Sequence, residues 1–179
     1  MERRTLFLKI VGFSVVASVG YGIAHDMVTA HYCSQYFLPP HHPIIFETQI
    51  PFLLALIWGV LATFWMGAIF GTMVATCAVV GRYPLLPFPR LKKALVRGLA
   101  IILVLAVLAL VAVHFIGGYA MSRHPDVPDL DRRLAAAAVA HGLSYTATAI
   151  LGIGLCIWSV LVRIKLSRSN EPSPIHESD

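Results

Sequence analysis

Four long apolar runs constrain the fold of this chain more than any other feature of its sequence. They lie at about residues 5–27, 51–80, 95–119 and 134–162, and each reaches the ~20 residues that a helix needs to cross the hydrocarbon of a bilayer. Only helices and closed barrels satisfy their backbone polar groups in lipid, and runs such as IILVLAVLALVAV lack the alternation of a barrel strand. The sequence therefore predicts an all-α membrane protein whose four transmembrane helices form one bundle.

The composition agrees with a membrane protein and argues against a nucleic-acid-binding one. Hydrophobic residues make up 58% of the chain and charged residues only 13%, whereas a soluble domain has about a quarter of its residues charged. A net charge of +5 would suit nucleic acid in a soluble protein, but here the basic residues cluster beside the apolar runs. We expect the lipid bilayer as the partner of this chain, and no nucleic acid.

The basic residues also predict an orientation in the membrane. Eleven of the fourteen Lys and Arg residues fall near the N-terminus, in the loop 81–97 or after the fourth run, and the other three are Arg123, Arg132 and Arg133 in the third loop. Because basic loops stay in the cytoplasm, both termini and the loop 81–97 should be cytoplasmic, with the first and third loops outside. We expect a multi-pass protein of the bacterial inner (plasma) membrane.

The chain divides into one domain and a tail. Residues 1–166 are expected to form the four-helix transmembrane domain, whose first helix remains uncleaved. Residues 167–179, SRSNEPSPIHESD, are polar and contain proline, so a disordered cytoplasmic tail is expected there. Small residues recur four apart in three of the apolar runs, a spacing that lets helices approach closely in lipid and marks inward faces. The same spacing is compatible with a homo-oligomer or a larger membrane complex.

Histidines on three of the predicted helices suggest a common site near the outer side. By residue counting, His25, His114 and His141 lie at similar depths below the outer boundary. His25 shares a helical face with small residues, and an unpaired imidazole among apolar residues, such as His114, costs a few kcal/mol. We therefore expect the three imidazoles to face inward, with Asp26 and Glu47 as nearby carboxylates.

Such a group has two interpretations. Three imidazoles with a carboxylate could bind a transition metal ion (Zn, Cu or Fe), and two histidines on facing helices could ligate a single haem. Asp26 or Glu47 would be a ligand or would orient a ligating imidazole. Alternatively, the histidines are buried residues that form hydrogen bonds with hydroxyl groups of neighbouring helices.

Two stretches, HDMVTAHYCSQYF and AHGLSY, carry a resemblance to a known family. With them the chain resembles an uncharacterised family of small bacterial four-helix integral membrane proteins that share an HDxxTAxxCxxYF motif at the end of the first helix. The resemblance implies that a shared site includes His25, Asp26 and His141, supported by three further residues, Thr29, Cys33 and Tyr145. It implies no activity for that site.

Three classes of function remain open from the sequence. The first is a membrane protein with a histidine and carboxylate site for a metal or cofactor near the outer (periplasmic) face. The second is a proton-coupled carrier or channel in which these histidines titrate, and the third is a structural accessory subunit of a membrane complex. The sequence lacks a catalytic triad motif, a phosphate-binding loop and an HExxH motif, so it leaves open whether the protein is an enzyme.

Overall fold

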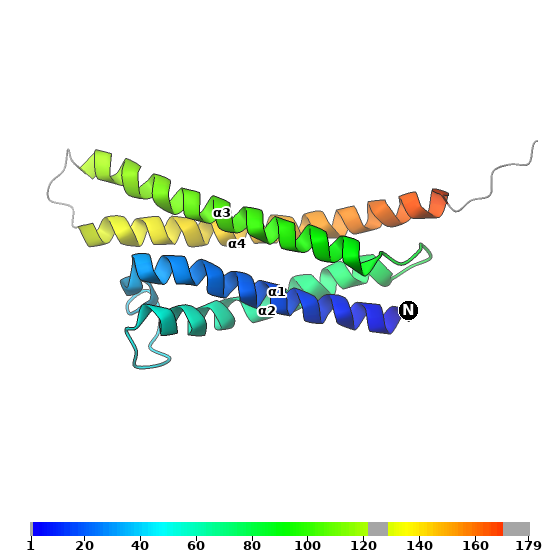
Figure 1. Ribbon diagram of the computed structural model, residues 1–179, viewed down its shortest axis with the longest axis horizontal. Coiled ribbons are helices and arrows are strands. Elements are labelled where there is room, and N and C mark those ends of the chain that lie inside the picture. The colour runs from blue at the N-terminus through cyan, green and yellow to red at the C-terminus, as the bar shows by residue number, and fades with distance from the viewer. Residues whose placement is uncertain (1, 122–128, 170–179) are drawn as a thin grey trace, which may run out of the picture.

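The computed structural model describes residues 2–121 and 129–169, which form four long α-helices and one short 3-10 helix. Helices α1 (Arg3–Tyr32) and α2 (Pro51–Val79) form one antiparallel pair, and α3 (Phe88–Met121) and α4 (Asp129–Ser169) form a second pair that packs against the first (Figure 1). The short helix η1 (Ser34–Phe37) follows α1 at the end of the bundle opposite the N-terminus. The prediction of an all-α fold with four packed helices is confirmed.

Several helix boundaries differ from those expected, among them the start of α4, which is Asp129 rather than residue 134. Helix α1 continues past residue 27 to Tyr32, and α3 begins at Phe88 rather than near residue 95. Pro89 lies in the first turn of α3, where its missing N–H breaks no hydrogen bond, so the proline-containing link ends earlier than its composition suggested. Helix α4 continues to Ser169, so residues 167–169 of the expected disordered tail are helical; residues 170–179 lie outside the described residues.

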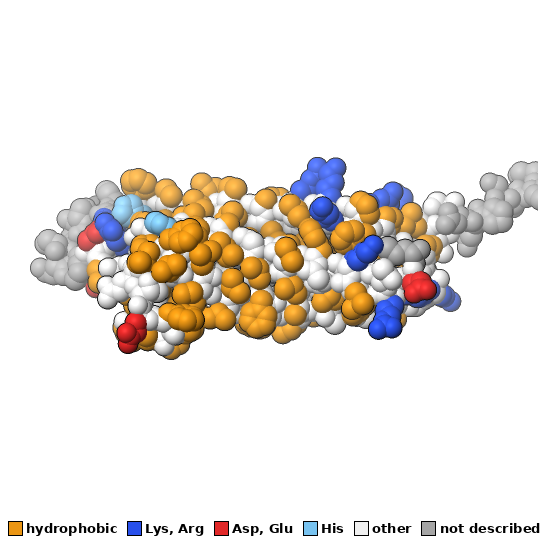
Figure 2. Space-filling view, turned by 60° about the horizontal axis from the view of Figure 1, so that its bottom comes forward, with side chains coloured by type: hydrophobic (Ala, Val, Ile, Leu, Met, Phe, Trp, Pro, Cys, Tyr) orange, Lys and Arg blue, Asp and Glu red, His pale blue; other side chains and the backbone are white. Residues whose placement is uncertain are grey.

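The described part of the chain contains four helices that are long and apolar enough to cross a membrane: Arg3–Tyr32, Pro51–Val79, Phe88–Gly117 and Asp129–Ser169. Large apolar side chains remain exposed on their outer surfaces, among them Ile101, Leu108 and Ile150. Figure 2 shows apolar side chains over the middle of the bundle and most of the visible Lys and Arg side chains toward the end that holds the N-terminus. So large an exposed apolar surface is expected to contact lipid, as in a multi-pass membrane protein.

Helices α1 and α2 approach each other at glycines. A Cβ atom added to Gly22 would lie 2.4 Å from the carbonyl oxygen of Gly59, and one added to Gly59 would lie 2.7 Å from the Cα atom of Ile23. Further along, a Cβ on Gly67 would lie 2.8 Å from the Cα atom of Val15. The backbones therefore touch over several turns, which confirms that the small residues of α1 and α2 mark inward faces.

Two arginines donate hydrogen bonds at the C-terminal end of α2, because the last turn of a helix leaves carbonyl groups without partners. The guanidinium of Arg163 on α4 is buried and donates to the carbonyl oxygens of Cys77 at 2.6 Å and Val80 at 2.8 Å. It also donates to the backbone of the following link, at Pro84 and Tyr83. Arg3 of α1 donates to the carbonyl oxygen of Val79 at 2.8 Å. These bonds connect α2 to both α4 and α1.

Candidate metal centre

The extension of α1 to Tyr32 places His25 and Asp26 inside a helix rather than at its end. Both side chains are buried, with 4% and 5% of their surface exposed. The hydroxyl of Thr29 lies on the same face and donates to the carbonyl oxygen of His25 at 3.2 Å. This end of α1 therefore presents an imidazole and a carboxylate to the interior of the bundle.

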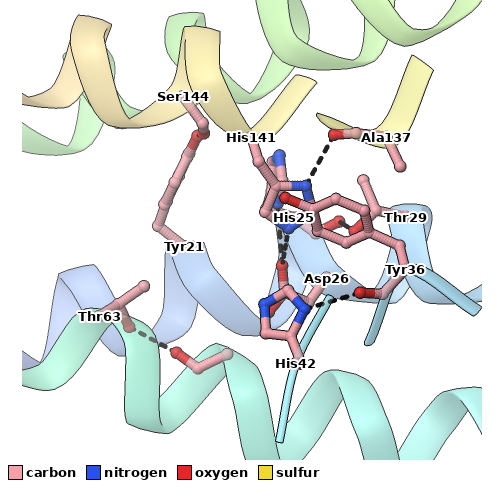
Figure 3. Close-up of polar contacts among 11 residues, drawn as sticks. Tyr21, His25, Asp26, Thr29, Tyr36, His42, Thr63, Ala137, His141 and Ser144 are labelled. Atoms are coloured by element: carbon pink, nitrogen blue, oxygen red, sulfur yellow. Dashed lines mark hydrogen bonds and ion pairs between the residues drawn. The ribbon is translucent and has the colours of Figure 1, made fainter. Parts of the chain in front are cut away.

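The carboxylate of Asp26 lies between two imidazoles from different helices (Figure 3). Its Oδ1 atom is 3.0 Å from Nδ1 of His25 and 3.3 Å from Nε2 of His141 on α4. His141 is also buried, with 6% of its surface exposed. Among the helix pairs that touch each other, α1 and α4 make the least extensive contact, and Asp26 and His141 provide one of the side-chain contacts that join them.

The hydrogen bonds around the two imidazoles show which nitrogen atoms are available to ligate a metal ion. Nδ1 of His141 lies 2.8 Å from the carbonyl oxygen of Ala137 and donates to it, because a carbonyl can only accept. Nε2 of His141 therefore faces Asp26 as the nitrogen that is free to ligate. Nε2 of His25 is buried and has no hydrogen-bond partner among the described residues.

The group has the composition and spacing of a metal site. His25, Asp26 and His141 each offer one ligand atom, and these atoms all lie within 4.8 Å of one another. Imidazole nitrogen and carboxylate oxygen are common ligands of zinc, and imidazole also suits copper and iron. The backbone bond at Nδ1 of His141 is the kind of contact that holds a ligating ring in one tautomer and orientation.

Residues that follow α1 cover this group. The ring centroid of Tyr36, in η1, lies 4.5 Å from that of His141, and the Phe37 centroid lies 5.6 Å from it. His42 holds Tyr36 in place, since its Nδ1 atom donates to the carbonyl oxygen of Tyr36 at 2.7 Å. The ring centroid of His42 lies 4.6 Å from that of Trp58. Burial lowers the pKa of His42 below its usual value and so favours the neutral imidazole.

Two of the predicted ligands lie outside this group. His114, on α3, accepts a hydrogen bond at Nδ1 from the hydroxyl of Tyr32 or donates one to it, over 2.7 Å. Glu47 is exposed in the loop between η1 and α2. Of the three histidines that we expected to converge, the structure thus brings together His25 and His141, with Asp26 as the carboxylate.

The three predicted supporting residues also differ in whether they contact the group. Thr29 adjoins the group through its bond to His25, whereas Cys33 is buried with its Sγ atom 3.8 Å from Oε1 of Gln35. The ring centroid of Tyr145 lies 6.3 Å from that of His141. One turn of α4 deeper into the bundle, the hydroxyl of Ser144 forms a hydrogen bond with that of Tyr21.

Sequence reasoning missed the residues that cover the group. None of Tyr36, Phe37 and His42 was among the residues predicted for the site. Their positions depend on the tight turn after Tyr32, which has no periodic pattern. The signal that could have found Tyr36 and Phe37 is that both belong to the HDxxTAxxCxxYF motif that contains His25 and Asp26.

Comparison of the chain with protein-family models, with curated proteins and with solved structures finds no match. The comparisons identify no family. Of the resemblance based on HDMVTAHYCSQYF, the part that the structure supports is the architecture of four membrane-length helices.

Proposed function

We propose that this protein is a multi-pass protein of the bacterial inner membrane that binds one transition metal ion near the outer (periplasmic) face. His25, Asp26 and His141 are the protein ligands, and a water or a substrate atom takes the remaining position. The observation that carries the proposal is the convergence of three ligand atoms, all buried, from two helices. An open coordination position would allow chemistry at the metal.

The burial of Asp26 favours a cation at this position. A carboxylate is costly to bury unless positive charge or several donors compensate it, and its two contacts here are imidazoles that are neutral or singly charged. A divalent ion would provide that compensation and would also use the lone pair of one nitrogen from each ring. The ring centroids of His25 and His141 are 4.5 Å apart and nearly perpendicular, which leaves no room for a porphyrin between them, so a metal ion fits better than haem.

The basic residues support the outer location. Arg3, Arg82 and Arg163 belong to the end of the bundle where the N-terminus lies, and the group lies toward the opposite end (Figure 1). With the basic end in the cytoplasm, the group is near the periplasmic side.

The test is metal content of the protein purified in an uncharged detergent. After incubation with Zn²⁺ and removal of free ions, the wild type should retain about one ion per chain, and Co²⁺ should give the visible absorption of a tetrahedral or five-coordinate site. His25→Ala, His141→Ala and Asp26→Asn should each weaken binding by at least tenfold, on the order of the loss that follows removal of one ligand or its orienting partner.

His31→Ala is the matched control, because His31 lies on the same helix but is exposed and bonds to the carbonyl oxygen of Met27. His114→Ala and Glu47→Gln should also retain the metal, since both residues lie outside the group. Wild-type protein that is well folded but binds none of Zn²⁺, Co²⁺, Cu²⁺ and Fe²⁺ would show that the group is a hydrogen-bonded contact between helices.

A second candidate is proton binding, as in a proton-coupled carrier. Without a metal, both nitrogens of His141 face acceptors, the carbonyl oxygen of Ala137 and the carboxylate of Asp26. That arrangement places a hydrogen-bond acceptor next to each ring nitrogen, as a proton-binding site requires. A flux assay in reconstituted vesicles distinguishes the two candidates. Proton flux that Asp26→Asn abolishes and that chelators leave unchanged would favour the carrier. The absence of such proton flux would favour the metal protein.

A further inference from the structure

A pocket separate from the metal group lies between the first loop and the start of α2. Its volume is about 460 Å³, within the range of 300–1,000 Å³ that small-molecule sites occupy. Its walls combine the end of η1, the loop that leads to α2 and the first turns of α2. Phe37 separates the two sites, since it lines the pocket and its ring also lies 5.6 Å from that of His141.

The lining is apolar and aromatic, with a single carboxylate. Phe37, Phe46 and Trp58 provide aromatic rings, and isoleucines and prolines provide most of the remainder. Glu47 is the one charged side chain among the described residues that line the pocket, and it forms no ion pair with another described residue. A ligand there would meet a negative charge beside aromatic faces.

Nearby groups do not offset that charge. The described loop from Cys33 to Ile50 contains no Lys or Arg. His42 lies against Trp58, behind the pocket wall, and its lowered pKa keeps it neutral at neutral pH. Aromatic faces attract cations through their quadrupole, most strongly Trp, so the carboxylate and the rings favour the same sign of ligand charge.

We propose that this pocket binds an organic cation with an apolar body, held by the carboxylate of Glu47 and the aromatic rings of Trp58 and Phe46. The size of the pocket suits one small molecule, and its apolar walls suit a lipophilic ligand rather than a hydrated metal ion. This binding does not depend on the metal proposed for His25, Asp26 and His141.

Two probe ions of the same shape and opposite charge test the proposal. Tetraphenylphosphonium and tetraphenylborate can be compared by equilibrium dialysis with the full chain in an uncharged detergent, after subtraction of binding to empty micelles. The cation should bind saturably to one site per chain and at least tenfold more tightly than the anion. In a Trp65→Phe, Trp158→Phe background, the remaining fluorescence of Trp58 should change with the same midpoint.

Glu47→Gln should weaken binding of tetraphenylphosphonium by about tenfold and leave tetraphenylborate little changed. Glu2→Gln is the matched control, since it removes one exposed acid at the opposite end of the bundle. Equal binding of the two ions, or equal effects of the two substitutions, would overturn the proposal. Displacement of the cation by diacylglycerol, a lipid without a cationic group, would also overturn it and would identify the pocket as a lipid site.

Discussion

Asp26 determines the properties of the buried group, because it contacts both imidazoles. Burial of a carboxylate is tolerated only with such partners, and removal of one partner from a buried charged pair typically costs about 3–5 kcal/mol. Asp26→Asn keeps the shape of the side chain and removes its charge, so it distinguishes a ligand from a space-filling residue. That distinction is why Asp26→Asn belongs in the metal-binding test.

The stability of the cover over this group should depend on pH through His42. Burial lowers the pKa of His42 below its usual value of 6.5, so the unfolded chain binds a proton more readily than the folded one. The stabilisation that the neutral ring provides is complete above pH 6.5 and decreases as the pH falls through the lowered pKa. Between pH 7.5 and pH 5.5, the melting temperature of the wild-type protein should therefore decrease by more than that of His42→Phe.

The control for this measurement is His41→Phe, because His41 is exposed next to His42. That variant should retain the pH dependence of the wild type. If the melting temperatures of His42→Phe and wild-type protein decrease by the same amount over this pH interval, the titration of His42 does not cause the pH dependence.

Single residues of the site were only partly predictable from sequence. Helical periodicity and the neighbouring small residues correctly placed His25 in the interior, Asp26 was expected only as a nearby carboxylate, and residue counting placed His141 at a similar depth. The partner of His114 was not predictable, because it is Tyr32, which lies in the part of α1 beyond its expected end at residue 27. An error in a helix end thus became an error in a side-chain contact.

At the scale of helices, the glycine contacts between α1 and α2 should tolerate almost no added volume. Gly22→Ala places a methyl group 2.4 Å from the carbonyl oxygen of Gly59, so the backbones must move apart. We expect a loss of about 1–3 kcal/mol in the free energy of unfolding, as for other overpacked interiors. Denaturation by SDS in mixed micelles, followed by circular dichroism, measures this loss.

Gly20→Ala is the matched control on the same helix, since a Cβ there meets nothing within 4 Å. It should leave stability unchanged or increase it slightly, because alanine favours helix more than glycine does. Similar losses in the two variants would show that helix flexibility, rather than close packing, explains the glycines.

Arg163 should stabilise the bundle by its hydrogen bonds rather than by its charge alone. Arg163→Met leaves the carbonyl oxygens at the end of α2 without donors, and we expect a loss of about 3 kcal/mol in the free energy of unfolding, given that charged hydrogen bonds contribute about 1.5–3 kcal/mol each. Arg163→Lys should recover part of this, since an ammonium cannot reproduce the planar fork. Thermal unfolding in detergent is the measurement.

Arg168→Met is the comparison for Arg163→Met, because Arg168 is exposed on the same helix. It should change stability by less than about 0.5 kcal/mol, as surface substitutions usually do. The sequence did not distinguish the two arginines, since both follow the fourth apolar run and both belong to the basic residues that predict the cytoplasmic side. The distinction arises from the position of the end of α2, which is a tertiary feature.

For the whole molecule, the orientation in the membrane is the prediction with the widest consequences. Cys33 is 1% exposed, so it is a poor target for labelling, and an exposed position nearby is needed. In a variant without the three native cysteines, His41→Cys should react with an impermeant maleimide in cells whose outer membrane alone is permeabilised, and Arg82→Cys only after the inner membrane is opened. The reverse pattern would place the group of His25, Asp26 and His141 on the cytoplasmic side.

The architecture was predictable at this scale because apolar length and composition determine which segments cross a membrane. All four predicted spans correspond to helices of the described chain. The arrangement of those helices was less predictable, since small residues mark an inward face without naming the helix that it contacts. The structure pairs α1 with α2 and α3 with α4, and α1 and α4 meet at the His25, Asp26 and His141 group and at the bond between Tyr21 and Ser144.

The contact between α1 and α4 has a consequence for the insertion of the protein into the membrane. Among the described helices, α1 with His25 and Asp26 enters the membrane before the others, and His141 arrives with α4, the last of them. Until then an intramembrane carboxylate has an incomplete set of partners, which is costly in lipid. Translation that stops before α4 would therefore leave a polar defect exposed in the bilayer, and closure of the group would signal that insertion of all four helices is complete.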